Sequence, residues 1–191
     1  MYYLLPLEDE DCPPLPADAW RLLASCGDAE GNDCPLLTQA GNLGSNLEKQ
    51  FDTLLALIRR LAITGRPWKE LIRDEKELHD LGTVHIALPS GKVTEEHIWQ
   101  FKQGQVRLLW CYGGGKKVLL LVHLAVKKSQ KTSQTDMDAA GRAMQDYFRA
   151  RESRQLSIVG DKDDHTLHQL FARKAGKPRI PEKGKTGRDR R

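Results

Sequence analysis

The sequence lacks any long uninterrupted run of apolar residues. No stretch approaches the ~20 residues that a membrane-spanning helix requires. The short apolar run near the start, residues 2–7, is followed at once by acidic residues, and it lacks the basic flank and longer apolar region typical of a secretory signal. We therefore expect a soluble, cytoplasmic protein with no membrane partner.

The sequence also lacks the usual spacing of a zinc site. Its four cysteines are Cys12, Cys26, Cys34 and Cys111, and they form no C-x-x-C pair and have no histidine close by. In a reducing compartment such cysteines are expected to remain free thiols. We expect neither a metal nor another cofactor.

Apolar residues are fewer than in most compact domains, at 39%, whereas charged residues reach 29%. The charges are unevenly distributed: residues 1–40 contain eight acidic side chains and one arginine, while residues 173–191 contain nine basic and two acidic ones. We expect an acidic N-terminal extension (1–40), a core domain (41–155) and a basic, disordered tail (156–191). The acidic part is either a solvated arm or a cover over a basic cleft; the basic side favours a polyanionic partner.

Helical periodicity is clearest in residues 45–64, where apolar side chains form one stripe. Weaker patterns predict helices at Ala17–Ser25 and Trp68–Leu81, and a further amphipathic helix is predicted from Asp136 to about Arg154 with Thr135 or Asp136 as its N-cap. Val84–Leu88 is predicted as a short edge strand. Helices followed by strands favour an α+β fold.

Three strands are predicted in the middle of the chain, at His97–Lys102, Gln105–Tyr112 and Lys117–Lys127. The first turn is placed at residues 103–104 and the second at the glycines 113–115. Alternation then puts these residues on one face: Trp99, Phe101, Val106, Leu108 and Trp110. The opposite face is expected to carry Gln100, Lys102, Arg107, His123 and Lys127, together with Leu109, Cys111, Leu119 and Leu121, with the early helices packed at its glycine-loop end. A change of one residue in the glycine loop would reverse the faces of the third strand.

This block resembles the RelE/ParE superfamily of bacterial toxins, and within it the HigB-type branch that includes a phage-derived toxin family. The resemblance rests on Ile98-Trp99-Gln100-Phe101-Lys102, on Val106-Arg107 and on the run from His123 to Ser133, of which Lys-Lys-x-Gln-Lys-Thr is the most specific part. It covers roughly residues 45–152 and implies a helical pair packed on a small antiparallel sheet, followed by a C-terminal helix. Gln100 stands where the family has Glu, Lys102 where it has Arg, and Leu124-Ala125 where it has Gly-Phe.

The resemblance implies a toxin of a type II toxin–antitoxin system, a metal-independent mRNA endonuclease that acts at the ribosome and is inhibited by a cognate helix-turn-helix antitoxin. Such cleavage needs a group that takes the 2′-hydroxyl proton, cations that hold the phosphate, and a proton for the leaving 5′-oxygen. The expected catalytic residues are Arg107, His123 and Lys127. The expected RNA-binding residues are Gln100, Lys102, Lys128 and Lys131.

Other interpretations remain open for the same residues. His123 is also compatible with a strand-end histidine bonded to the backbone, and Lys127 with a solvated strand end. Trp110 and Tyr112 are expected in the core and at its rim rather than as platforms for RNA bases. The alternative function is a non-catalytic RelE-like protein that binds RNA or a protein partner, including a gyrase inhibitor, and the loss of a carboxylate at Gln100 favours it.

Overall fold

The computed structural model describes residues 1–7, 16, 19–64, 78–114, 117–127 and 132–161. The strands are β1 (Tyr2–Pro6), β2 (Arg21–Cys26), β3 (Leu78–Ala87), β4 (Val93–Gln103), β5 (Val106–Tyr112), β6 (Val118–Val126) and β7 (Leu156–Ile158). The helices are α1 (Pro35–Gly41), α2 (Ser45–Ile63) and α4 (Gln134–Glu152). Among the described helices, none combines the length and the apolar character needed to cross a membrane.

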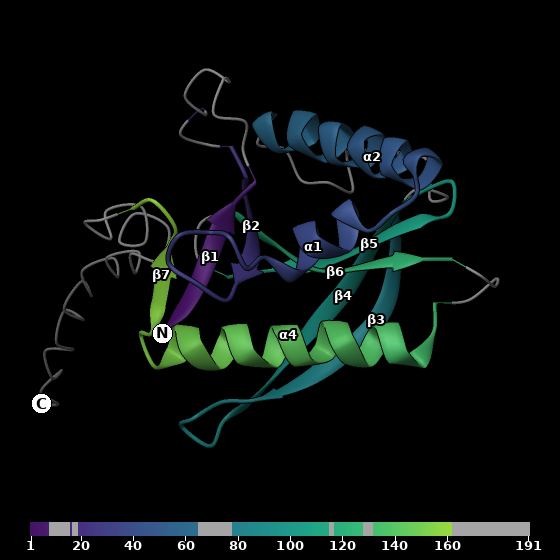
Figure 1. The fold of residues 1–191 in the computed structure, drawn as a ribbon. Helices are drawn as coiled ribbons and strands as arrows, with labels where there is room; N and C mark the ends of the chain where they lie inside the picture. Colours follow the sequence, from purple (N-terminus) through teal and green to yellow (C-terminus); the bar gives the residue numbers. More distant parts are fainter. Residues whose placement is uncertain (8–15, 17–18, 65–77, 115–116, 128–131, 162–191) are drawn as a thin grey trace, which may run out of the picture.

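All seven strands belong to one mixed sheet with the order β3-β4-β5-β6-β2-β1-β7. The part from β3 to β6 is antiparallel, whereas β2 lies parallel to β6 and β7 lies parallel to β1. Figure 1 shows α1 and α2 on one face of the sheet and α4 across the other. The molecule is therefore a three-layer arrangement with the sheet in the middle.

This architecture corrects the expected fold, because the sheet is neither small nor wholly antiparallel. The expected acidic extension and basic tail both contribute strands: β1 and β2 come from the first 40 residues, and β7 lies beyond residue 155. Residues 8–15, 17–18 and 162–191 lie outside the described part of the chain. The RelE-like pattern of a helical pair on a small sheet is thus wrong for this protein.

The helix predicted over Ala17–Ser25 is wrong, since β2 occupies Arg21–Cys26. This strand lies between β6 and β1, so both of its faces are covered: Leu22 packs among the residues under α1 and α2, while Leu23 packs on the α4 side. A central strand covered on both faces reads as a continuous apolar run, which periodicity alone does not separate from a short helix.

The edge strand predicted at Val84–Leu88 is confirmed as part of the longer β3. The helix predicted over Trp68–Leu81 is wrong at its end, because Leu78–Leu81 belong to this strand. Its remaining part, residues 68–77, lies outside the described residues. At Ala87 the outer side of β3 is closed by α4, where the Gln145 side chain donates to the Ala87 carbonyl and accepts from its N–H.

The helix predicted from residue 45 is confirmed as α2, and its apolar stripe packs on the sheet. Phe51, Leu54 and Ile58 are buried there against the aromatic face of β4 and β5. This face holds stacked rings: Trp110 lies 5.1 Å from Phe101 and 5.9 Å from Trp99, centroid to centroid. The core position expected for Trp110 is confirmed, because none of its surface is exposed.

The turn between β4 and β5 lies at Gly104–Gln105, one residue later than predicted. Lys102 consequently pairs with Arg107, and Trp99 pairs with Trp110. Moving a two-residue turn by one position shifts the pairing by two residues, and the side-chain period of a strand is also two. The predicted faces of both strands are therefore confirmed although the predicted pairs are not.

β6, the third of the strands predicted in the middle of the chain, contains a bulge that divides it into two halves. Odd-numbered side chains point to one face of the sheet before the bulge and to the other face after it. Leu109 pairs with His123, but Trp110 pairs with Leu121, so Val122 is the extra residue. His123 therefore shares the face of Arg107, as predicted. Leu119 and Leu121 lie on the aromatic face instead, so their predicted position is wrong. The Arg107 face is covered by α4 rather than by the early helices.

The last predicted helix is confirmed as α4, although its N-cap is Ser133 rather than Thr135 or Asp136. Near its other end, the Tyr147 hydroxyl donates to the Gly113 carbonyl at 2.6 Å. A Cβ at Gly113 would lie 2.6 Å from Val118 and 2.7 Å from this hydroxyl. Glycine at 113 thus permits the close approach of α4 to the loop after β5.

Candidate functional site

The site is built where β4 ends, β5 begins and β6 ends, on the face covered by α4. One row of paired residues crosses these strands as Gln100, Leu109 and His123, and the next row contains Lys102, Arg107 and Ala125. Diagonal neighbours on one face of a sheet lie about 7–8 Å apart. Arg107 and His123 are such neighbours, so two of the predicted catalytic residues share one small area.

His123 is held by the first turn of α4. Its Nε2 lies 2.9 Å from Oδ1 of Asp136, and only 13% of the His123 side chain is exposed. The second carboxylate oxygen of Asp136 accepts from the Ser133 hydroxyl at 2.6 Å. The backbone N–H of Asp136 in turn donates to Ser133 Oγ at 3.1 Å, which is the N-cap bond of the helix. The expectation of a histidine bonded only to backbone is thus replaced by a histidine–carboxylate pair.

Asp136 is a carboxylate at neutral pH. Burial acts to raise its pKa, but the hydrogen bonds from Ser133 and His123 and the nearby imidazole outweigh burial and hold the pKa below its ordinary value of 3.8. The sequence does not predict this pair, because the residue pattern indicates Asp136 only as a possible helix cap. An acidic residue in the first turn of a helix that follows a strand ending near a histidine is the signal that could have revealed it.

Arg107 is more enclosed than a phosphate-binding residue is expected to be, with 7% of its surface exposed. Its Nη1 donates to the carbonyls of Gly104 and Val106, both at 2.8 Å. Burial lowers the pKa of the guanidinium from its ordinary value; an arginine nevertheless stays charged at neutral pH. Within the described part of the chain, Nε and Nη2 of Arg107 carry no protein hydrogen bond, so these are the donors left for a ligand.

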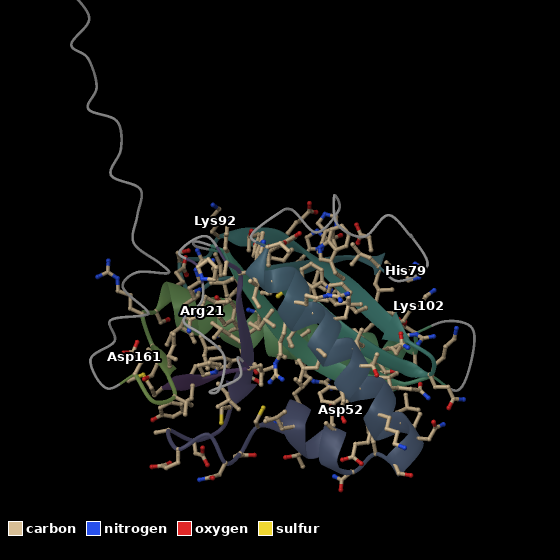
Figure 2. All side chains as sticks on the ribbon, turned by 90° about the horizontal axis from the view of Figure 1, so that it is seen from above. Arg21, Asp52, His79, Lys92, Lys102 and Asp161 are labelled. Atoms are coloured by element: carbon tan, nitrogen blue, oxygen red, sulfur yellow. The ribbon has the colours of Figure 1, made fainter. Side chains whose placement is uncertain are left out.

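Gln100 is almost fully buried, at 5% exposed, and its Oε1 accepts from the Thr132 hydroxyl at 2.8 Å. Lys102 is half-buried and lies on the same face by pairing with Arg107. Figure 2 shows Lys102 and His79 toward one side of the molecule, away from Asp161. Lys127 is half-buried just beyond β6, where its backbone N–H donates to the Gln105 carbonyl.

The structure therefore brings together four of the predicted residues on one face, namely Gln100, Lys102, Arg107 and His123, and Lys127 follows the end of β6 beside Gln105. Lys128 and Lys131 lie outside the described residues. The structure adds Thr132 and Asp136 to the predicted site residues. Both side chains join the start of α4 to the strands that carry the site. In the described ranges, no group of three or more His, Cys, Asp or Glu side chains could hold a metal ion.

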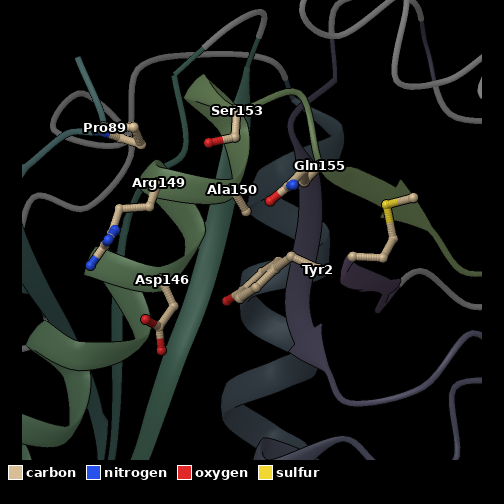
Figure 3. A pocket seen from close by; sticks show the side chains of 8 residues that line it. Tyr2, Pro89, Asp146, Arg149, Ala150, Ser153 and Gln155 are labelled. Carbon is tan, nitrogen blue, oxygen red and sulfur yellow. The ribbon is translucent and has the colours of Figure 1, made fainter.

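A hollow of about 530 Å³ lies elsewhere, between β1 and the second half of α4. Figure 3 shows the Tyr2 ring in it, with its hydroxyl directed toward Asp146 of α4 and with Arg149 on the same helix. Arg149 follows Asp136 by thirteen residues along the helix, which is about 20 Å. This hollow is thus too far from His123 to take part in the same chemistry.

The carboxylate of Asp136 predicts a pH-dependent contribution to stability. Because its pKa is lower in the folded chain than in the unfolded one, the stabilisation is complete above the ordinary value of 3.8 and is lost as the pH falls through the lower folded value. We expect Asp136→Asn to reduce the free energy of unfolding by about 1–2 kcal/mol at pH 7, and this difference to shrink toward zero as the pH falls through the lowered folded pKa of Asp136. Urea unfolding of both proteins across pH 2–7 measures this difference; a constant difference would contradict it.

The candidate site lies within a region of the chain that matches the model of a known protein family. Residues 58–145, a little under half of the chain, match the model of a family described as Phage derived protein Gp49-like (DUF891). The matched segment runs from within α2 into α4, and it includes every candidate residue named above. No curated protein and no solved structure matches the chain. The region that carries the candidate site is therefore similar to the Gp49-like family of phage-derived proteins.

Proposed function

We propose that the chain is the toxin of a type II toxin–antitoxin system, of the HigB-type branch, and that it cleaves mRNA at the ribosome without a metal. The observation that carries the proposal is the position of His123, bonded to a carboxylate and diagonal to Arg107 at the cationic end of the sheet. The similarity to a phage-derived family, which resembles RelE/ParE toxins, supports the same function.

The chemistry follows from the roles that these side chains can take. His123 accepts the proton of a 2′-hydroxyl, and the resulting oxygen attacks the adjacent phosphorus. The bond to the 5′-oxygen breaks, leaving a 2′,3′-cyclic phosphate on one fragment and, after protonation, a 5′-hydroxyl on the other. Arg107, Lys102 and Lys127 stabilise the negative charge that builds on the phosphate oxygens.

Controlled expression of the full chain in bacteria tests the proposal. We expect growth arrest accompanied by new 5′-hydroxyl ends within mRNA, detected by sequencing of ligated RNA ends. A double variant, Lys102→Glu with Lys127→Glu, should abolish both effects, because it replaces two cations of the site with anions. The matched control, Lys49→Glu with Lys92→Glu, makes the same charge change at exposed positions on α2 and in the β3–β4 turn.

Two outcomes would contradict a nuclease. Growth arrest with intact mRNA and damaged DNA would indicate inhibition of gyrase through protein contact. Unchanged growth together with intact mRNA, at an expression level confirmed by immunoblot, would indicate that the chain does not cleave RNA in cells. Co-expression with the neighbouring gene separately tests the antitoxin, whose presence should restore growth.

A second candidate is a RelE-like protein that binds RNA without cleaving it. The observation that favours it is the enclosure of Arg107, whose Nη1 is engaged by carbonyls of its own hairpin. In this case the purified protein would bind RNA, and its affinity would fall as the salt concentration rises. No new RNA ends would form. Electrophoretic mobility shifts and end mapping on one RNA separate the two candidates.

A further inference from the structure

Asp136 joins the first turn of α4 to the end of β6 through both of its carboxylate oxygens. Oδ1 meets Nε2 of His123 at 2.9 Å, and Oδ2 accepts from the Ser133 hydroxyl at 2.6 Å. The backbone N–H of Asp136 is fixed as well, by its bond to Ser133 Oγ. Two hydrogen bonds thus hold the carboxylate, and a third holds the backbone of the same residue.

The protonation of the pair follows from its chemistry. An ionised carboxylate has only acceptors, so the hydrogen between Oδ1 and Nε2 must belong to the imidazole. A neutral His123 then carries its proton on Nε2 and has a lone pair on Nδ1. Nδ1 is therefore the ring nitrogen that can accept a proton.

We propose that Asp136 is a positioning residue that fixes the Nε2–H tautomer of His123 and thereby makes Nδ1 the atom that takes the 2′-hydroxyl proton. This inference rests on the proposed nuclease function. It assigns a role to a residue outside the predicted cationic set, and it specifies which nitrogen reacts. Asp136 itself does not contact the reacting atoms.

A second contact supports this role for the start of α4. The Thr132 hydroxyl donates to Oε1 of Gln100 at 2.8 Å, four residues before Asp136. Gln100 and His123 flank Leu109 in one row across the sheet, so the segment from Thr132 to Asp136 is tied to both ends of that row. The helix start is consequently held in a fixed position over the predicted site, as a positioning element must be.

The tautomer of His123 is measured directly in the folded chain by long-range proton–nitrogen NMR. We expect the wild-type chain to show a downfield, slowly exchanging proton on Nε2, because this hydrogen is bonded to a carboxylate. Asp136→Ala should abolish that signal and shift the ring toward a mixture of tautomers. Asp138→Ala is the matched control: it removes a carboxylate from the same end of α4, where Asp138 accepts from Gln134 rather than from His123. An unchanged His123 spectrum in Asp136→Ala would overturn the proposal.

Cleavage kinetics supply a second measurement, made on variants that circular dichroism shows to be folded. Asp136→Ala should lower kcat by about 10²–10⁴-fold, as expected when a general base loses its orienting carboxylate, with KM changed by less than about two-fold because uncleaved RNA does not bind to Asp136. Asp138→Ala should leave both constants unchanged. Equal losses in the two variants, or a change confined to KM, would overturn the positioning role. If the wild-type chain cleaves no RNA, the proposed function fails, whereas the NMR result still decides whether Asp136 sets the tautomer.

Discussion

His123→Ala is expected to lower the rate of RNA cleavage by about 10²–10⁴-fold, the range usually contributed by a general base. The loss should appear in the chemical step, because the imidazole is the group that takes the 2′-hydroxyl proton. Binding of uncleaved RNA should change by less than about two-fold, since the phosphate is held mainly by cations. Single-turnover cleavage measures the first quantity, and titration with a 2′-deoxy substrate analogue measures the second.

His85→Ala is the matched control for this experiment. His85 also pairs with a carboxylate, Glu95, at 2.8 Å, but it lies exposed on the β3–β4 hairpin away from Arg107. Its replacement should leave cleavage unchanged. Comparable losses in the two variants would show that the effect of His123→Ala is not specific to the site, and a loss of RNA binding alone would reassign His123 to substrate contact.

Trp110→Ala is expected to reduce the free energy of unfolding by about 3–5 kcal/mol, the range for truncation of a buried aromatic side chain. Trp110 has no exposed surface, and its ring contacts Phe101 in a stacked geometry and Tyr112 edge-on, each with centroids 5.1 Å apart. Truncation leaves a cavity in the layer between β5 and α2 that the surrounding rings can only partly fill. Urea denaturation at constant pH measures the change.

The control for this substitution is Val93→Ala on β4, where the valine side chain is 56% exposed. A change within about 0.5 kcal/mol is expected there, as for most surface positions. A loss below about 1 kcal/mol for Trp110→Ala would show that the aromatic layer repacks around the missing ring.

The sequence was sufficient to predict the face on which the candidate residues lie. Alternation along β4 and β5 placed Arg107 opposite the aromatic side chains, and this held although the turn moved by one residue, because the pairing then changed by a full period. The loop between β5 and β6 had no such protection. Tyr112 pairs with Leu119, three residues beyond the partner that a turn at 113–115 implies, and this odd shift reverses the faces of Leu119 and Leu121. The bulge at Val122 then adds one residue and returns His123 to the Arg107 face, and no residue type in β6 signals it.

Other features depended on contacts between distant parts of the chain and were missed. The sequence predicts a helix over Ala17–Ser25 because a short apolar run fits either structure, and the choice is made by β1 and β6 on either side of β2. Asp136 was recognised as part of a helix start, but its contact with His123 depends on how α4 crosses the sheet. Pairing of this kind is decided by tertiary packing, which local patterns do not encode.

The position of β2 beside β6 has a consequence for how the sheet is assembled. Leu22 pairs with Leu119, 97 residues further along the chain, whereas β4, β5 and β6 follow one another through short turns. The hairpins can therefore form early, but the join to β2 requires closure of a long loop, whose entropic cost precedes any gain from pairing. Such non-local pairing raises the contact order and slows folding. We therefore expect the strand that carries His123 to complete its sheet late, after the local hairpins have formed.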